Sequence, residues 1–260
     1  MEWLQKLLKK PSSDKPRIHA IDELRGLAVC DMVFYHFLYT FSSIFGMGWS
    51  TALFRFFQPH QPFLAGTFIV LAGISANLSR SNMKRGLRLA VVAVAISVIT
   101  ILFMPTEAIW FGVLHLLSAA MILTGLLLPA LNRLPVWPSI ALCAAIVLFT
   151  ANIDRGYLGF FGWELVPMPG FFYQTDWLMW LGTYSPTLYS ADYFPLLPWL
   201  FVFLGGFFFG RYARDGRFPK WTYKRHVPFL SFVGRHALLI YIVHQPLFYG
   251  VGLLLSPLFR

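Results

Sequence analysis

The sequence predicts an all-α membrane protein, a polytopic bundle of about seven transmembrane helices. Three observations lead to this prediction. Of the 260 residues, 57% are hydrophobic and only 12% are charged, whereas an ordinary soluble domain is about 25% charged. Apolar segments of nearly membrane-spanning length recur along the whole chain, and basic residues cluster between alternate pairs of them. A soluble protein with a large core would need far more polar surface than this chain offers.

The spans are predicted from length and polarity, because a spanning helix needs about 20 mostly apolar residues. Two of the seven segments, the third and the fifth, are short for a full span. The last contains Pro246, which predicts a kink or an early end. The segments are 22–45, 61–79, 87–104, 109–131, 137–152, 194–211 and 229–256.

The orientation follows from the lysines and arginines. If the N-terminus is cytoplasmic, 16 of the 21 basic residues fall on the cytoplasmic side. The positive-inside rule therefore predicts a cytoplasmic N-terminus, an external C-terminus and a multi-pass protein of the inner (plasma) membrane. The net charge of +10 is then explained by topology and by anionic membrane lipid. No nucleic-acid motif is present, so no nucleic-acid partner is expected.

The predicted organisation is a basic cytoplasmic segment, 1–17, followed by one transmembrane domain, 18–260. The first segment is expected to contain a short interfacial helix. The longest connection, an external loop at about 153–193, is rich in aromatic residues and is expected to lie against the membrane surface as a lid. The two cysteines show no metal-type spacing, and neither a disulfide nor a metal site is expected.

The first span, "IDELRGLAVCDMVFYH", carries several ionisable groups, and such groups inside a membrane are functional candidates. At 100° and 1.5 Å per residue, Arg25 and His36 lie within about 20° of one helix face and about 16 Å apart. Asp22 lies within about 40° of His36, and Asp31 points to the opposite side. Structural alternatives remain for each residue. Arg25 can snorkel to headgroups, Asp22 can cap the helix, His36 can bond a backbone carbonyl, and Asp31 can form a structural pair.

Further histidines occur in later spans. The span directions allow His115 and His244 to meet His36 in the middle to outer half of the bundle, with Gln245 beside His244. His60 stands at an external helix mouth. Each histidine alone has an equally good structural reading, but three together favour a functional site.

The cytoplasmic loop "RSNMKRGLRL" concentrates positive charge. Arg85 and Arg88 are three residues apart and share a helix face, and Arg80 and Lys84 add to the charge. Paired arginines suit a phosphorylated cytosolic ligand. The alternative is that the loop only follows the positive-inside rule.

Several motifs carry a resemblance to a known family. "RIHAIDELRGLAVCDMVFYH", with Asp22, Arg25, Gly26 and His36, is similar to the first span of transmembrane acyltransferases. "FIVLAGISANLSR", "GVLHLLSAAMIL", "DYFPLLPWLFVFLGGFFFGR" and "GRHALLIYIVHQP" extend the likeness over about 17–250. The sequence resembles the bacterial branch of the heparan-alpha-glucosaminide N-acetyltransferase catalytic-domain family. It is more distantly similar to the acyltransferase family 3 enzymes.

The resemblance implies transfer of an acetyl group from cytosolic acetyl-CoA to an amine or hydroxyl of an extracytoplasmic carbohydrate or glycolipid. His36 would be the catalytic base or nucleophile. His60 is the second choice, since the animal enzyme places its catalytic histidine in the loop after the first span. The other expected roles are coenzyme phosphate binding by Arg25, Lys84, Arg85 and Arg88, and a reaction chamber lined by His115, His244 and Gln245.

Two other functions are considered. A proton-coupled transporter could use the intramembrane His and Asp residues, but the internal repeat typical of many carriers is not visible. A haem- or quinone-binding redox protein would need facing histidines at matched depths. The sequence leaves open the acceptor, the acyl chain length, the role of Asp31 and the oligomeric state, for which a homodimer is one candidate.

Overall fold

The computed structural model describes residues 17–255, and these are mostly helical. The predicted interfacial helix near the N-terminus lies outside the described residues. The first span is α2, which continues without a break as one π-helical segment, Thr40–Ile44. The α-helices are α2 (His19–Tyr39), α3 (Gly48–Phe57), α4 (Gln61–Asn77), α5 (Asn82–Phe103), α6 (Val113–Leu126), α7 (Leu128–Leu131), α8 (Val136–Thr150), α9 (Leu196–Arg214), α10 (Pro228–Arg235) and α11 (Ala237–Leu255).

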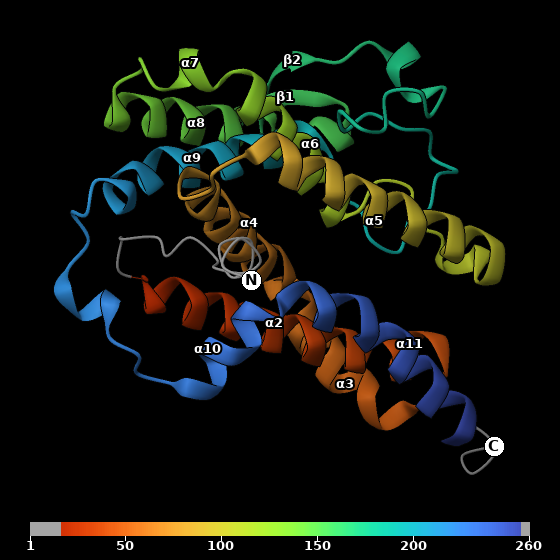
Figure 1. The fold of residues 1–260 in the computed structure, drawn as a ribbon. Helices are drawn as coiled ribbons and strands as arrows, with labels where there is room; N and C mark the ends of the chain where they lie inside the picture. The colour runs from red at the N-terminus through yellow and green to blue at the C-terminus, as the bar shows by residue number, and fades with distance from the viewer. Residues whose placement is uncertain (1–16, 256–260) are drawn as a thin grey trace, which may run out of the picture.

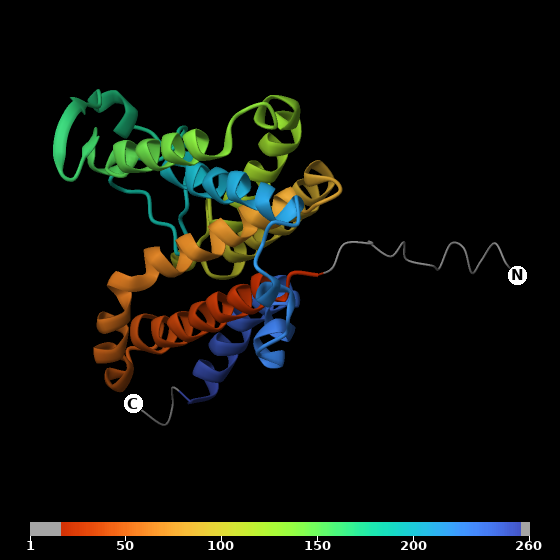
Figure 2. The same ribbon diagram turned by 90° about the vertical axis from the view of Figure 1, so that its left-hand side faces the viewer.

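The helices form two groups with α4 between them (Figures 1 and 2). One group consists of α2, α3, α10 and α11, and the other of α5, α6, α8 and α9. Helix α4 packs closely on α9 and also contacts α2, so it joins the two groups. The main apolar core lies in the second group and includes Phe203, Phe207 and Leu116, all without solvent exposure.

Five helical segments are long and apolar enough to cross a membrane, which agrees with a multi-pass membrane protein. Two of the seven predicted spans are shorter than expected. The segment predicted at 61–79 is the 17-residue α4, and the one at 109–131 contains only the 14-residue α6 and the short α7. The count of seven and the direction of the N-terminus remain predictions.

The close packing of α4 on α9 depends on two glycines. A Cβ atom added at Gly73 of α4 would collide with the backbone of Phe203, and one added at Gly206 of α9 would collide with the backbone of Val70. Small residues let helix backbones approach in this way inside a membrane. These glycines therefore set the contact that joins the two helix groups.

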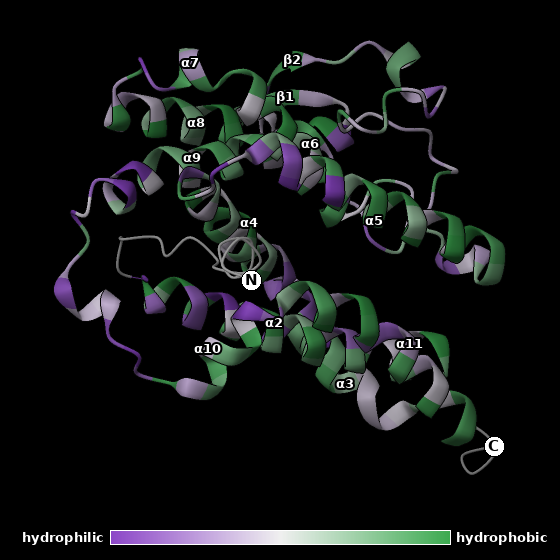
Figure 3. Cartoon of the chain, in the orientation of Figure 1, coloured by the Kyte–Doolittle hydropathy of each residue, from purple (hydrophilic) through white to green (hydrophobic). Residues whose placement is uncertain are grey.

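Hydrophilic residues gather at one end of the bundle (Figure 3). They lie at the start of α2, at the start of α5 and in the segment that follows α9. This end corresponds to the predicted cytoplasmic side, since the loop after α4 and the loop after α9 meet there.

The opposite end carries the long connection between α8 and α9. It contains an antiparallel hairpin of β1 (Tyr157–Phe160) and β2 (Trp163–Pro167), which the all-α prediction did not include. The segment after it packs on the loop before α6, where Phe194 N–H donates to Phe111 O over 2.9 Å. At the C-terminal end, the predicted segment 229–256 is broken at His236 into α10 and α11, and α11 runs through Pro246.

Candidate active site

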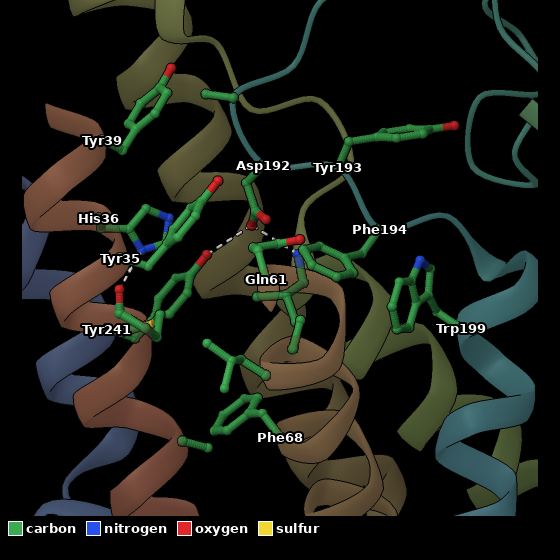
Figure 4. A pocket seen from close by; sticks show the side chains of 16 residues that line it. Tyr35, His36, Tyr39, Gln61, Phe68, Asp192, Tyr193, Phe194, Trp199 and Tyr241 are labelled. Carbon is green, nitrogen blue, oxygen red and sulfur yellow. Dashed lines mark hydrogen bonds between the residues drawn. The ribbon is translucent and has the colours of Figure 1, made fainter. Parts of the chain in front are cut away.

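A cavity of about 190 Å³, here called the chamber, surrounds His36 between the two helix groups (Figure 4). Helices α2 and α4 supply most of its wall, and the end of the α8–α9 connection with single residues of α6, α9 and α11 completes it. The polar and aromatic residues that line it are Tyr35, His36, Tyr39, Gln61, Phe68, Asp192, Tyr193, Phe194, Trp199 and Tyr241.

A larger cavity of about 1510 Å³, here called the mouth, opens at the hydrophilic end of the bundle. Positive charge dominates its wall, with six basic side chains against the carboxylates of Asp22 and Asp215. The basic residues are Arg17, Arg25, Arg80, Arg85, Arg214 and Lys220. Such a surface attracts a polyanion.

Arg25 is held in a fixed position in the wall of the mouth. Its guanidinium donates to Asp22 Oδ1 over 3.2 Å and also to Ser75 Oγ of α4. Asp22 is buried and also accepts a 2.6 Å hydrogen bond from Arg17 Nε. The Asp22 carboxylate therefore orients two arginines, and Arg25 does not simply reach outward to the headgroups.

A third cavity of about 370 Å³, here called the channel, lies between the mouth and the chamber. It shares Arg25, Ser75 and Arg85 with the mouth. It shares Phe68 and Tyr241 with the chamber. Because each pair of neighbouring cavities has common wall residues, the three form one series from the basic end of the bundle to His36.

His36 pairs with His244 inside the bundle. His244 Nε2 lies 3.2 Å from His36 Nδ1, and His36 Nδ1 also lies 3.1 Å from Met32 O. His244 Nδ1 faces Tyr241 O at 2.7 Å.

These contacts determine where the protons lie in the neutral pair. His244 Nδ1 faces carbonyl oxygens and must carry a hydrogen, which leaves its Nε2 as an acceptor. His36 Nδ1 then faces two acceptors and must also carry a hydrogen. The Nε2 of His36 therefore keeps a free lone pair, and no described residue hydrogen-bonds to it. A free imidazole nitrogen beside a cavity can accept a proton or attack a carbonyl.

Asp192 stands in the chamber wall at the end of the α8–α9 connection. Its Oδ2 accepts hydrogen bonds of 2.9 Å from Val113 N–H and 2.9 Å from the Tyr241 hydroxyl. Burial raises the pKa of the Asp192 carboxyl, and these two hydrogen bonds act in the opposite direction. The carboxyl thus ties the α8–α9 connection to the starts of α6 and α11.

A second polar contact involves Tyr39 in the chamber wall. The Tyr39 hydroxyl donates to Glu107 Oε2 over 2.7 Å and lies 3.0 Å from the Tyr189 hydroxyl. Tyr39 belongs to α2, whereas Glu107 lies in the α5–α6 connection and Tyr189 in the α8–α9 connection. Both connections therefore meet the first span at the chamber.

The structure brings some of the sequence-predicted site residues together. His36 and His244 form a pair, and Arg25 and Arg85 share the wall of the mouth and the channel. Arg88 lines only the channel.

Three other predicted residues lie apart from the chamber and the mouth. Lys84 is exposed at the start of α5 and lines none of the three cavities. Gln245 accepts a hydrogen bond from Thr40 Oγ1 over 2.9 Å, outside the chamber wall. His115 caps the start of α6, where its Nδ1 accepts from Gly112 N–H over 3.2 Å and its Nε2 lies 3.3 Å from Ser97 Oγ.

Asp31 and His60 occupy a separate groove on the other side of α2. Aromatic rings, including Phe34 and Phe57, form most of its wall. Asp31 makes no hydrogen bond or ion pair with any described residue. This groove adjoins the chamber, since Tyr35 and Leu64 line both cavities.

The main residues that sequence reasoning missed are Asp192 and Tyr241. Both lie inside motifs that carry the family resemblance, since "DYFPLLPWLFVFLGGFFFGR" begins at Asp192 and "GRHALLIYIVHQP" contains Tyr241. Neither residue was singled out, because Asp192 is in a connection without regular structure and Tyr241 looks like an ordinary aromatic residue of a span. The motifs themselves were the signal that could have found them.

Comparison with known proteins gives one match. Residues 17–246 match the family model described as heparan-alpha-glucosaminide N-acetyltransferase, catalytic. No curated protein and no solved structure matches the chain. The matched range covers nearly all of the described residues and includes the chamber, the channel and the mouth.

Proposed function

The chain belongs to the heparan-alpha-glucosaminide N-acetyltransferase catalytic-domain family, and from this membership we propose that it transfers acetyl from cytosolic acetyl-CoA to an extracytoplasmic acceptor. The family indicates a membrane acetyltransferase. The finer assignments of donor, acceptor and residues are our proposal. The observation that carries it is the series of three adjoining cavities, which lie between a basic surface at one end of the bundle and a free imidazole nitrogen within it.

The donor would bind at the mouth, where the phosphates of coenzyme A meet arginines in a fixed geometry. Arg25 is supported because Asp22 and Ser75 hold its guanidinium. Arg85 is supported because it borders both the mouth and the channel. Guanidinium groups bind phosphate oxygens in a bidentate manner.

The acyl-carrying arm would extend through the channel toward the chamber. Apart from four arginines (Arg25, Arg85, Arg88 and Arg235), the wall of the channel is mostly apolar and includes Leu114 and Met121. Arg25 and His36 are 11 residues apart on α2, which corresponds to about 16 Å along the helix. An extended arm rather than a compact group would be needed to cover this distance.

In the chamber, His36 would act as the general base. The acceptor nitrogen or oxygen attacks the thioester carbonyl as its proton moves to His36 Nε2. The C–S bond then breaks, and the imidazolium returns the proton to the departing thiolate of coenzyme A. His244 would keep His36 in the reactive tautomer through the Nδ1 contact.

The orientation in the membrane completes the proposal. A cytoplasmic N-terminus places the basic mouth in the cytosol, where acetyl-CoA is found, and places the external connections at the acceptor side. The acceptor would be a carbohydrate or glycolipid bearing an amine or hydroxyl, as in the family. The bacterial inner membrane is the proposed location.

The proposal is tested by vectorial transfer in proteoliposomes. Vesicles are loaded with D-glucosamine, and radiolabelled acetyl-CoA is added outside. We expect labelled N-acetylglucosamine inside the vesicles with the wild-type protein and none with a His36→Ala variant. Movement of unmodified sugar or protons without any acetylated product would instead support a transporter.

A further inference from the structure

The chamber contains a carboxylate that the reaction described above does not use. Asp192 lies near the end of the α8–α9 connection, shortly before α9 begins. The backbone on both sides of it is fixed, since Ala191 N–H donates to Ala108 O and Phe194 N–H donates to Phe111 O. In Figure 4 its carboxyl group points into the chamber, on the side opposite His36.

The two oxygens of this carboxylate have different surroundings. Oδ2 accepts from both Val113 N–H and the Tyr241 hydroxyl. Oδ1 accepts no hydrogen bond from any residue between 17 and 255. A carboxylate has about four lone-pair positions, so Oδ1 retains full capacity for a ligand. Gly112 contributes to this arrangement, because a Cβ there would collide with the carboxyl group.

Tyr241 gives the carboxylate its position relative to the donor. Its side chain borders both the chamber and the channel. A donor arm that arrives through the channel must therefore pass the tyrosine whose hydroxyl group holds Asp192. The carboxylate is thus placed where the donor and acceptor sides of the site meet.

We propose that Asp192 is an acceptor-binding residue whose Oδ1 accepts an N–H of the acceptor's primary amine. This inference rests on the proposed function. The chamber then presents two hydrogen-bond acceptors, His36 Nε2 and Asp192 Oδ1, to the reacting atom. A primary amine carries two hydrogens and can donate to both while its lone pair attacks the thioester. A hydroxyl carries one hydrogen and can satisfy only one of them.

Asp192 would therefore determine specificity for an amine over a hydroxyl. The acceptor's proton still moves to His36 and from there to the coenzyme A thiolate, so Asp192 neither gains nor loses a proton overall. Tyr241 would act as a positioning residue, because it reaches the acceptor only through the Asp192 carboxylate.

The test compares kinetic constants for the two substrates in purified protein. D-glucosamine serves as the amine probe, and D-glucose serves as the hydroxyl probe. For Asp192→Asn we expect the KM for glucosamine to rise about 10-fold or more, the effect of losing one hydrogen bond to a charged group. The KM for acetyl-CoA should stay within about twofold of wild type, since the mouth is unaltered. Wild type should acetylate glucosamine in strong preference to glucose.

Two further variants separate acceptor binding from a structural effect. Tyr241→Phe keeps the ring between the chamber and the channel but removes the hydroxyl, so the KM for glucosamine should rise by a smaller factor than in Asp192→Asn. Glu164→Gln removes an exposed carboxylate on β2 of the same external connection, and it should leave both KM values unchanged. If Asp192→Asn does not fold, the Tyr241→Phe result decides the question.

Several results would overturn the inference. The first is an unchanged KM for glucosamine in Asp192→Asn or, if that variant does not fold, in Tyr241→Phe. The second is a wild-type protein that prefers glucose to glucosamine. The third is a wild-type protein that binds acetyl-CoA but acetylates neither sugar. A wild-type protein that is folded but does not bind acetyl-CoA would instead overturn the proposed function.

Discussion

The Nε2 atom of His244 lies 3.2 Å from the Nδ1 atom of His36, although 208 residues separate them in the chain. His244 Nδ1 is bound to the carbonyl of Tyr241, at 2.7 Å. This chain of contacts places a hydrogen on His36 Nδ1 and leaves its Nε2 free. In catalytic histidines a neighbouring group commonly fixes the proton on one ring nitrogen, and the other nitrogen is then free to react. The arrangement of His36 and His244 is of this kind.

His36→Ala should abolish acetyl transfer without loss of donor binding. General acid–base catalysis contributes about 10²–10⁴-fold to rate, so the turnover number should fall by at least that factor. Radiolabelled transfer and calorimetric titration with acetyl-CoA measure the two properties. His60→Ala is the matched control, because His60 is exposed in the separate groove. Equal losses in both variants, or a fully active His36→Ala protein, would remove His36 from the mechanism.

His244→Ala should lower the turnover number by about 10-fold, because His36 loses the partner that fixes its tautomer. This loss is smaller than the full contribution of general acid–base catalysis to the rate. The acetyl-CoA affinity should not change, since His244 lies outside the mouth and channel walls. His236→Ala provides the control, as this histidine is exposed and its ring interacts with the carbonyl of Phe232, at 2.9 Å, and with the Phe232 ring. Turnover within twofold of wild type in His244→Ala would show that the pairing has no catalytic role.

Loss of Arg85 and Arg88 together should weaken acetyl-CoA binding by about 10–100-fold, which corresponds to one or more hydrogen bonds to a charged phosphate. Calorimetric titration of the purified double variant measures the Kd. Lys84→Ala is the matched control in the same helical turn, because Lys84 lines neither the mouth nor the channel. If the double variant binds as tightly as wild type, the coenzyme does not use this surface.

Gly206→Ala should destabilise the fold, because the added Cβ collides with the backbone of Val70 where α9 crosses α4. Overpacking of this kind typically costs about 1–3 kcal/mol. Thermal unfolding in detergent should show a Tm lower by several degrees. Gly250→Ala is the control, since no atom lies within 4 Å of a Cβ built at that position of α11. Equal Tm values for the two variants would mean that the α4–α9 contact can relax.

The membrane class and the first span could be predicted from sequence, because both depend on local properties. Hydrophobic length and the positions of basic residues are features of short segments. Helical geometry is also local, and it placed Arg25 and His36 on one face of α2. In the structure Arg25 lines the mouth and the channel, His36 lines the chamber, and Asp31 lines the separate groove.

The structure differs from the sequence predictions at His115 and in the last predicted segment. His115 was expected in the chamber, but its ring instead satisfies the Gly112 N–H at the start of α6. A helix start leaves backbone donors without partners, and a nearby imidazole nitrogen can accept from one of them. The break in the last predicted segment occurs at His236 rather than at Pro246, which lies inside the continuous helix α11.

The sequence by itself determined that this chain is a helical membrane protein of an acetyltransferase family, with Arg25 and His36 on one face of its first span. Only the tertiary structure decided that His244 is the partner of His36, that Asp192 faces the same chamber and that three cavities lie next to one another. The physical reason is that a helix face follows from residues a few positions apart. A hydrogen bond or a cavity wall between residues up to 208 positions apart depends instead on how the two helix groups and α4 pack together.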